Sequence, residues 1–250
     1  MAVLRVPYHL DEYLPDLDFP LEAAEIISAD LPSGVIWARL AAVYRLVAGA
    51  VARTARQGSR PVVLSGDCTT ALGTMAGLQR AGIDAGIVWF DAHGDVQTLD
   101  TTASGYVGGL PLRLLAGYRP ELIAAGLGLR PVAEHRIVLA GARDLDPPEV
   151  TYLDGALISR AEVAGLDAAA LPDGPLYVHL DLDVIDPSAV PGLRYPAPGG
   201  PGCAEVAAAL RLLLATGRVA AVGIACTWHP GYAAAAAIDP HLKAAFAAVS

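Results

Sequence analysis

Basic side chains are scarce in this 250-residue chain. Its 17 Lys and Arg residues are outnumbered by 26 Asp and Glu residues, which gives a formal net charge of −9. Lys243 is the sole lysine, and the arginines form no basic run. A nucleic-acid-binding protein needs a basic stripe or patch that neutralises phosphates. The composition therefore argues against that class, and we expect no nucleic-acid partner.

Long apolar runs are missing as well, although 54% of the residues are hydrophobic. A transmembrane helix needs about 18 or more consecutive apolar residues. The longest candidate, residues 35–55, is interrupted by Arg39, Arg45 and Arg53. The N-terminal segment meets acidic residues early and lacks the apolar core of a signal peptide. We therefore expect a cytoplasmic protein with no membrane partner.

Cysteine is rare too, because the chain has only Cys68, Cys203 and Cys226. This odd number of widely spaced residues makes neither a disulfide framework nor a Cys-x-x-Cys pair, which suits a reducing compartment. We expect Cys203 and Cys226 to be buried in the core, as free cysteines commonly are.

Short apolar runs alternate with longer helical patterns along the chain. The predicted strands are Ala2–Val6, Pro61–Ser65, Gly86–Phe90, Arg136–Ala140, Pro175–Leu180 and Val219–Ala225. The predicted helices are Ile36–Arg56, Thr70–Arg80, Leu110–Leu115, Ala161–Ala170, Cys203–Leu214 and Pro240–Val249. The strands are apolar throughout, as in sheets that are buried on both faces. The repeated order of strand then helix predicts a single α/β domain over residues 1–250, with a doubly wound, mostly parallel sheet and helices on both faces.

Acid-rich loops follow three of the predicted strands, where ligands bind in an open parallel sheet. Asp91, His93 and Asp95 follow one strand at a spacing of two, and Asp181 and Asp183 follow another. A lone aspartate is more simply a loop residue or a helix cap. Crowded carboxylates, however, are costly without a cation, and their oxygens suit Mn²⁺ or Mg²⁺. The pattern therefore indicates a metal site, and a carboxylate shared by two ions is usual in two-metal hydrolytic centres.

The third loop contains Asp67 and Cys68 at the start of a predicted helix. A helix N-terminus and nearby cations favour the thiolate, so we expect Cys68 to bind metal; the alternative is an inert buried thiol. His229 follows the last strand on the ligand side, and is a candidate catalytic residue or proton shuttle. His179 lies in the strand before Asp181, and we expect it to point away from the acids.

Five segments resemble, in order, motifs of the ureohydrolase family of arginases, agmatinases and formiminoglutamases. They are Ser65–Cys68 (Gly-Gly-Asp-His in the family), Asp91–Asp95 (Asp-Ala-His-x-Asp), Thr102–Gly105 (Thr-Ser-Gly), Gly141–Asp146 (Gly-x-Arg-Asp-x-Asp) and Asp181–Pro187 (Asp-x-Asp-x-x-Asp-Pro). Five ordered matches are far more specific than any one of them, and the resemblance extends over nearly the whole chain. It implies an arginase-like α/β/α fold and two Mn²⁺ ions per chain.

The resemblance also implies roles for individual residues. The implied metal ligands are Cys68, Asp91, His93, Asp95, Asp181 and Asp183. Asp91 and Asp181 would bridge the two ions, and a hydroxide between the ions would attack the guanidine or amidine carbon of a small-molecule substrate. Asp95 would also relay a proton to the leaving amine. The implied substrate contacts are Gln97, Ser104, Asp146 and Thr227, of which Ser104 and Asp146 match arginase residues that hold the α-carboxylate and the α-amino group.

Four positions depart from the arginase pattern. Cys68 stands where the family has a histidine ligand, and Gly108 stands where arginases have a histidine thought to shuttle protons. Thr227 replaces a glutamate that faces the guanidinium in arginases, and Tyr195 replaces a threonine. This combination resembles the amidinohydrolases that split Nω-hydroxy-L-arginine into L-ornithine and hydroxyurea in D-cycloserine biosynthesis. An N-hydroxyguanidine is less basic than a guanidine, so it needs less carboxylate pairing, and its lower pKa relaxes the need for a shuttle histidine. We therefore expect this substrate rather than L-arginine.

Three other interpretations are compatible with the residues. One is another ureohydrolase, and one is a zinc amide hydrolase like the histone-deacetylase-related enzymes, which use a catalytic histidine pair that this chain lacks. The third is a metal-dead binding protein, motivated by Cys68 and Gly108. As to assembly, arginases trimerise partly through a C-terminal tail, whereas Ser250 directly follows a predicted helix here, so we expect a monomer.

Overall fold

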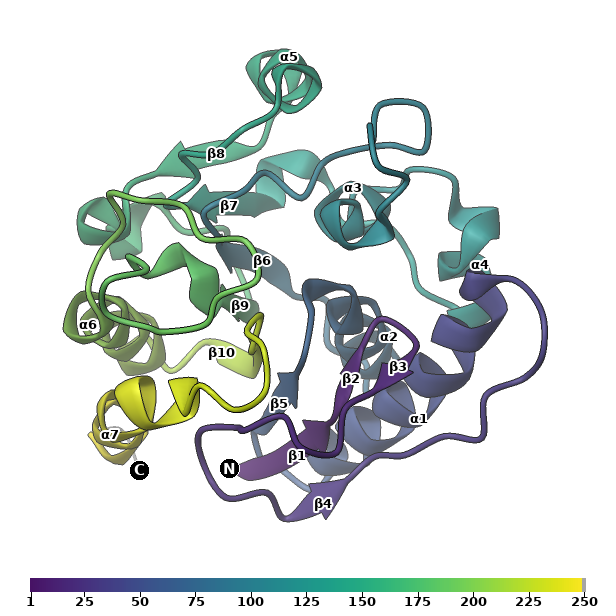
Figure 1. The fold of residues 1–250 in the computed structure, drawn as a ribbon, viewed down its shortest axis with the longest axis horizontal. Helices are drawn as coiled ribbons and strands as arrows, with labels where there is room; N and C mark the ends of the chain where they lie inside the picture. The colour runs from purple at the N-terminus through teal and green to yellow at the C-terminus, as the bar shows by residue number, and fades with distance from the viewer. Residues whose placement is uncertain (249–250) are drawn as a thin grey trace.

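The computed structural model describes residues 1–248, which form layers around a parallel sheet (Figure 1). The strands are β1 (Ala2–Val6), β2 (Tyr8–His9), β3 (Glu12–Tyr13), β4 (Glu25–Ile26), β5 (Pro61–Ser65), β6 (Gly86–Phe90), β7 (Ile137–Ala140), β8 (Ser159–Ala161), β9 (Leu176–Asp181) and β10 (Val219–Ala225). Within the described residues the sheet has eight strands in the order β4-β1-β5-β10-β9-β6-β7-β8, and each neighbouring pair is parallel. Strands β2 and β3 form a separate antiparallel hairpin.

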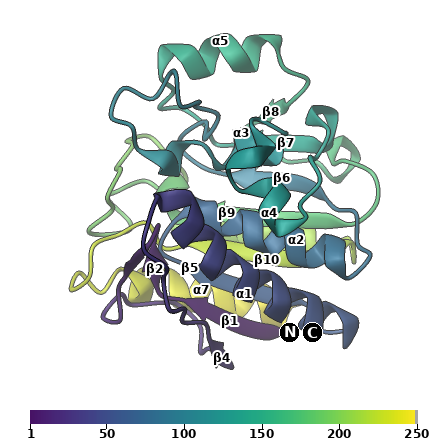
Figure 2. The same cartoon turned by 90° about the vertical axis from the view of Figure 1, so that its right-hand side faces the viewer.

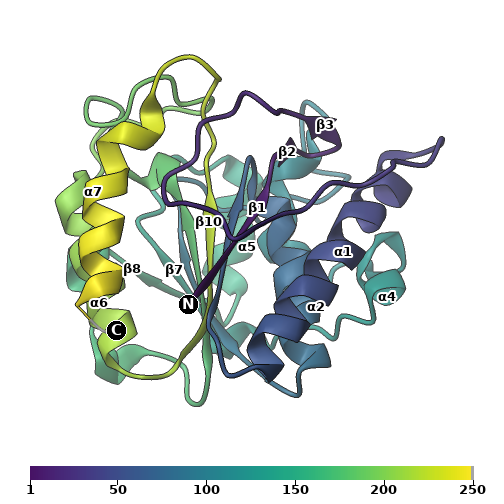
Figure 3. The ribbon, with the colours of Figure 1, turned by 90° about the horizontal axis from the view of Figure 1, so that it is seen from below.

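Helices cover both faces of the sheet. They are α1 (Ile36–Arg56), α2 (Ala71–Arg80), α3 (Pro111–Leu115), α4 (Ala124–Leu127), α5 (Pro147–Gly155), α6 (Cys203–Ala215) and α7 (Ala234–Ala247). Figure 3 shows α1, α2 and α4 on one side of the sheet and α6 and α7 on the other. Helix α5 lies at one end of the molecule, beyond the edge strand β8 (Figure 2). Among residues 1–248, no helix combines the length and the apolar character that crossing a bilayer requires.

The doubly wound sheet with helices on both faces confirms the predicted fold class. The predicted strands are present to within one residue at each end. The helix predicted at Ala161–Ala170 is wrong, because β8 ends inside this range and two short 3-10 turns, Val163–Gly165 and Ala168–Ala170, follow it. The side chain of Asp167 accepts a backbone N–H two residues ahead, which starts a new turn in place of a continuous helix.

The last helix begins earlier than predicted. Helix α7 starts at Ala234, whereas the sequence pattern predicted Pro240–Val249, of which Val249 lies outside the described residues. The carboxylate of Asp18 accepts the N–H of Ala235 at 2.9 Å, and so satisfies a donor that the first helical turn leaves free. This cap comes from the N-terminal part of the chain, so the local sequence gives no sign of it.

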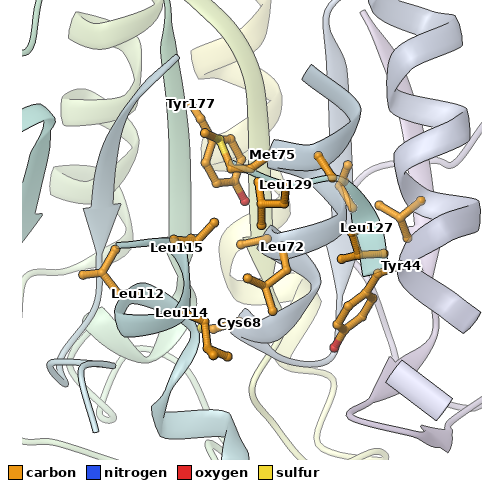
Figure 4. Close-up of a cluster of buried hydrophobic side chains, with 14 of the residues drawn as sticks. Tyr44, Cys68, Leu72, Met75, Leu112, Leu114, Leu115, Leu127, Leu129 and Tyr177 are labelled. Carbon is orange, nitrogen blue, oxygen red and sulfur yellow. The ribbon is translucent and has the colours of Figure 1, made fainter. Parts of the chain in front are cut away.

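Two clusters of buried side chains fill the space between the sheet and its helices. The cluster beneath α1 and α2 includes Leu72, Met75 and Tyr177 (Figure 4). Helices α1 and α2 approach closely at Gly77, where an added Cβ would lie 2.7 Å from the Cβ of Val51 and 2.8 Å from the carbonyl oxygen of Ala48. This contact fixes the position of α2 and of the loop that connects β5 to α2.

We expect Gly77→Ala to destabilise the fold, because the new methyl group cannot fit between α1 and α2. Overpacking of this kind costs about 1–3 kcal/mol in the free energy of unfolding. The matched control is Gly49→Ala in α1, where an added Cβ meets nothing within 4 Å; this change is expected to stabilise the helix by about 0.5–1 kcal/mol. Urea unfolding of both variants measures the difference, and equal stability of Gly77→Ala and the unchanged protein would contradict the close packing.

Candidate active site

The candidate site lies at the carboxyl ends of the central strands. In the sheet β5, β10, β9 and β6 are neighbours, so loops that are far apart in the sequence meet at this edge. Cys68 follows β5, Asp91 and His93 follow β6, Asp181 ends β9, and Thr227 follows β10. The structure therefore brings together all three acid-rich loops that the sequence singled out.

The first potential metal-binding cluster consists of Cys68, Asp91 and Asp181, all buried. The Cys68 thiol donates to Asp181 Oδ2 at 2.8 Å, and Cys68 Sγ lies 4.0 Å from Asp91 Oδ2. One ligand atom from each of the three residues lies within 4.8 Å of the other two. The thiol thus faces the carboxylates directly, as the ligand interpretation of Cys68 requires.

The second cluster consists of Asp91, His93 and Asp183. His93 Nδ1 lies 3.3 Å from Asp91 Oδ1 and 3.3 Å from Asp183 Oδ2. Asp91 therefore belongs to both clusters, with one carboxylate oxygen turned toward each. This arrangement fits the predicted role of Asp91 as a bridge between two ions.

Asp95, the remaining predicted ligand, has an unusual conformation. Its φ of 53° lies in the left-handed region, which non-glycine residues rarely adopt. Its carbonyl oxygen accepts the N–H of Arg113 at 3.1 Å, while its buried Oδ2 has no hydrogen-bond partner. A buried carboxylate oxygen without a partner is costly, so a strained residue carries an oxygen that is free for a cation.

Hydrogen bonds fix the orientation of the shared carboxylates. Asp91 Oδ1 accepts the backbone N–H of His93 at 2.7 Å, and Asp91 Oδ2 accepts the indole N–H of Trp89 at 3.0 Å. Asp181 Oδ1 accepts the backbone N–H of Asp183 at 2.9 Å and the hydroxyl of Thr227 at 2.5 Å. Partners of this kind hold metal-binding side chains in the orientation that the ion needs.

The electrostatics of the site favour bound protons when no cation is present. Burial, together with neighbouring carboxylates, raises the pKa of Asp95, of Asp181 and of the Cys68 thiol. The same causes raise the pKa of Asp183 to about 6. Burial lowers the pKa of His93, but hydrogen bonds to two carboxylates outweigh it and raise this pKa to about 12. The crowded acids thus stay protonated or paired with His93 unless another positive charge replaces the protons.

The residues present fit two divalent transition-metal ions. Each cluster combines carboxylate oxygens with one softer donor, the thiol of Cys68 or the imidazole of His93, a set that suits manganese or zinc. Such ions would neutralise the crowded carboxylates; Asp95 lies outside both clusters but lines the same cavity. In a metal-dead binding protein nothing would offset the free-energy cost of burying these crowded carboxylates, which argues against that alternative.

Four of the five cluster residues, all except Asp91, line a cavity of about 260 Å³. The residues lining it are Asp67, Cys68, His93, Asp95, Gln97, Thr102, Ala103, Ser104, Tyr106, Gly108, Gly109, Asp146, Glu149, Asp181, Asp183, Tyr195 and Thr227. Most of the acids are buried, whereas Ser104 and Asp146 are exposed. Metal-binding groups thus occupy the interior of the cavity, and small polar groups mark its opening.

The predicted substrate-binding residues all line this cavity, although at different depths. Gln97 Nε2 donates to Asp146 Oδ2 at 2.9 Å, and the hydroxyl oxygen of Ser104 accepts the N–H of Tyr106 at 3.2 Å. Thr227 lies deeper, with its hydroxyl donated to Asp181. Gln97, Ser104 and Asp146 thus present polar groups toward the opening, whereas Thr227 bonds to a carboxylate of the first cluster.

Two histidines lie elsewhere than the sequence suggested. His229 is exposed and outside the cavity lining, with its backbone N–H donated to the carbonyl of Gly192 at 2.9 Å, so its placement argues against a catalytic role. The expectation that His179 points away from the acids is wrong. Residues two apart on a strand share a face, so His179 lies on the same face as Asp181. Its ring stacks on Trp89, with centroids 3.7 Å apart, and the indole N–H of Trp89 donates to Asp91.

Glu149 is a cavity residue that the sequence reasoning missed. Its carboxylate accepts the backbone N–H groups of Val96 and of Asp146, each at 3.2 Å, and so ties α5 to the loop after β6. Burial raises its pKa. The spacing of Asp146 and Glu149 is that of a helix-capping box, and this signal, with two prolines between them, could have revealed both α5 and the buried glutamate.

Comparison with known proteins now identifies the family. Residues 2–234 match the model described as "Arginase family". The chain belongs to the arginase family. It is 30% identical over 238 residues to an arginase from Brucella melitensis, which covers 86% of this chain and 74% of that protein. The match favours this family over the zinc amide hydrolase alternative.

Other relatives agree. An arginase from Bacillus subtilis is 33% identical over 171 residues, which covers 63% of this chain and 57% of that protein. The aligned part is thus little more than half of that relative's length. An arginase structure from Bacillus caldovelox superposes with a TM-score of 0.83 at 24% identity, over 98% of this chain and 96% of that one. This likeness confirms the arginase-like fold.

We expect the purified protein to bind two Mn²⁺ ions per chain and to release protons as it does so. The protons are those that the raised pKa values of Asp95, Asp181 and Cys68 retain, so lower pH is expected to weaken binding. Elemental analysis gives the stoichiometry, and calorimetry in two buffers of different ionisation enthalpy counts the protons. One tightly held zinc, or binding without proton release, would refute this account.

Cys68→Ser is expected to weaken one metal site and leave the other in place. Loss of an outer partner of a metal ligand costs roughly 10- to 100-fold in affinity, and loss of a ligand should cost at least as much. Cys68→His should retain more metal, because it restores a nitrogen donor. Cys203→Ser is the matched control, since Cys203 is buried in α6 and outside the cavity lining. Full metal content in Cys68→Ser would show that the thiol only packs.

Proposed function

We propose that this arginase-family chain is a binuclear manganese amidinohydrolase that acts on a small guanidino amino acid. The observation that carries the proposal is the pair of metal-binding clusters that share Asp91 beside a cavity with a polar opening.

The metal ligands divide between two sites in this proposal. Cys68 and Asp95 would hold one ion, His93 and Asp183 the other, and Asp91 and Asp181 both. When bound, the two ions would act as Lewis acids that activate water for hydrolysis of the guanidine carbon–nitrogen bond. Asp95 would also relay to the leaving amine the proton that it requires.

The opening of the cavity suits an α-amino acid. Asp146 is exposed and negatively charged when ionised, so it can pair with an α-amino group, and Gln97 holds its Oδ2 at 2.9 Å. The hydroxyl of Ser104 lies free of other side chains at the same opening and can donate to an α-carboxylate. A substrate held at this end extends its guanidine group toward the clusters.

Apart from the predicted metal ligands, the carboxylates that line the described cavity near its guanidine end are already engaged. Asp67 is engaged by the N–H groups of Leu10 and Thr69, and Glu149 by two backbone N–H groups. Thr227 donates its hydroxyl to a metal-binding carboxylate. A less basic head group fits this environment better than a guanidinium. We therefore propose Nω-hydroxy-L-arginine as the substrate, with L-ornithine and hydroxyurea as products.

The resemblance in sequence suggests in addition that the hydroxyurea released would serve D-cycloserine biosynthesis.

A side-by-side assay of the manganese-loaded protein tests the substrate. We expect kcat/KM for Nω-hydroxy-L-arginine to exceed that for L-arginine by about 10² or more, the discrimination available to a site that pairs with a specific polar group. Agmatine, which has no carboxylate, should be poor. Chromatography of ornithine and hydroxyurea gives the rates, and equal turnover of both arginines would refute the substrate proposal.

Asp146→Asn should raise KM roughly 10- to 100-fold, because a hydrogen bond to a charged group is replaced by a neutral contact. The amide keeps the shape of the side chain, so kcat and metal content should change little. Asp154→Asn is the control, since Asp154 lies on the same helix, exposed, and pairs with Arg160 instead. An unchanged KM in Asp146→Asn would remove Asp146 from the substrate site.

A further inference from the structure

One wall of the cavity is aromatic and rests on the N-terminal hairpin. Tyr106 and Tyr195 both line the cavity, with ring centroids 5.4 Å apart. The Tyr106 ring occupies the space over Gly108, where an added Cβ would overlap the ring and its hydroxyl. The hydroxyl of Tyr106 thus lies at a cavity position that a side chain at residue 108 would otherwise fill.

The hydroxyl of Tyr106 is bonded to a histidine from a distant part of the chain. His9, in β2, has its Nε2 3.2 Å from the Tyr106 hydroxyl oxygen and its Nδ1 2.9 Å from the carbonyl oxygen of Gly66. His9 is buried, 8% exposed, and its two hydrogen bonds go to a carbonyl and a phenol. Neither hydrogen-bond partner carries a charge that would compensate a buried imidazolium, so this pair of partners favours a neutral ring.

The direction of these two bonds follows from the chemistry of the partners. A carbonyl oxygen can only accept, so the single proton of a neutral His9 ring lies on Nδ1. Nε2 then has a lone pair and can only accept, which makes Tyr106 the donor. The proton of the Tyr106 hydroxyl is therefore directed at His9, and its oxygen presents lone pairs to its other neighbours.

The hairpin holds His9 in this place through backbone contacts. The N–H of Gly66 donates to the carbonyl of Tyr8 at 2.9 Å, and the N–H of Leu10 donates to Asp67 Oδ2 at 2.6 Å. A Cβ at Gly66 would overlap the carbonyl of Tyr8, so only glycine allows this approach. The same loop that leads to Cys68 thus fixes the histidine that orients Tyr106.

We infer that Tyr106 is a specificity residue whose hydroxyl oxygen, with its proton directed at His9, accepts a hydrogen bond from the N-hydroxyl group of the substrate. The inference rests on the proposed function. It identifies the residue that recognises the N-hydroxyl group, by which the proposed substrate differs from arginine. Tyr195 borders Tyr106 in the same wall, and even a hydroxyl donated from Tyr195 would leave one acceptor position on Tyr106 for the substrate. His9 acts as a positioning residue.

The state of the His9 ring is the first test and needs no catalysis. Two-bond nitrogen–proton NMR spectra of histidine-labelled protein distinguish the two neutral tautomers and the charged ring. We expect His9 as the neutral tautomer protonated at Nδ1. A ring protonated at Nε2, or at both nitrogens, would turn Tyr106 into a donor toward the cavity and overturn the inference.

The second test compares the ratio of kcat/KM for Nω-hydroxy-L-arginine over that for L-arginine. Tyr106→Phe removes the acceptor and should lower this ratio roughly 3- to 10-fold, the worth of one hydrogen bond. Tyr13→Phe, a half-exposed tyrosine on the same hairpin, is the control and should leave the ratio unchanged. An unchanged ratio in Tyr106→Phe would overturn the inference.

Two substitutions at His9 separate positioning from mere packing. Asparagine places an amide N–H near the position of Nδ1, so His9→Asn keeps the bond to Gly66 but loses the acceptor for Tyr106. Its ratio should fall as far as that of Tyr106→Phe. Glutamine can place its amide oxygen near the position of Nε2, so His9→Gln should keep a ratio closer to that of the unchanged protein. Equal ratios in His9→Asn and the unchanged protein would contradict the positioning role.

Failure of this inference can be told from failure of the proposed function. If the unchanged manganese-loaded protein turns over neither arginine compound, the proposed function is wrong, and the specificity role falls with it. If the unchanged protein prefers the N-hydroxy compound but Tyr106→Phe keeps the same preference, the proposed function stands and only the inference is refuted.

Discussion

The structure depends on one electrostatic constraint, the crowding of buried carboxylates at the carboxyl ends of β6 and β9. Asp91 and Asp181 each accept hydrogen bonds that fix their orientation. Both also lie close to the side chains of the other cluster residues in the interior. Burial and like charge make this arrangement unfavourable for a metal-free protein at neutral pH. The fold nevertheless holds the acids in place through backbone N–H groups, an arrangement that favours the binding of cations.

The departures from the arginase pattern form a consistent set around that centre. Where a histidine would extend from residue 108, glycine makes room for the ring of Tyr106. Where a glutamate would face the substrate, the hydroxyl of Thr227 bonds to Asp181 instead. Relative to the arginase pattern, these two positions carry no ionisable side chain, which is compatible with the proposed substrate, whose reacting group is less basic than a guanidine.

The sequence predicted what local pattern and spacing determine. Apolar runs located the central strands, and spacing-two acids located the clusters around Asp91 and Asp181. Prediction from the sequence failed where contacts between distant segments determine the structure. The cap on α7 comes from Asp18, and the partner of Tyr106 is His9, 97 residues earlier. His229 was misplaced for the same reason, since following the last strand does not determine on which side of the loop a side chain lies.

The most direct test of the account is anomalous diffraction from crystals of the manganese-loaded protein. Two metal peaks about 3.5–4 Å apart, the spacing typical of two-metal sites, are predicted on either side of the Asp91 carboxylate. One peak should lie against Cys68 Sγ and the other against His93 Nδ1. A single peak, or two peaks that do not share Asp91, would contradict the claim that this carboxylate organises the centre.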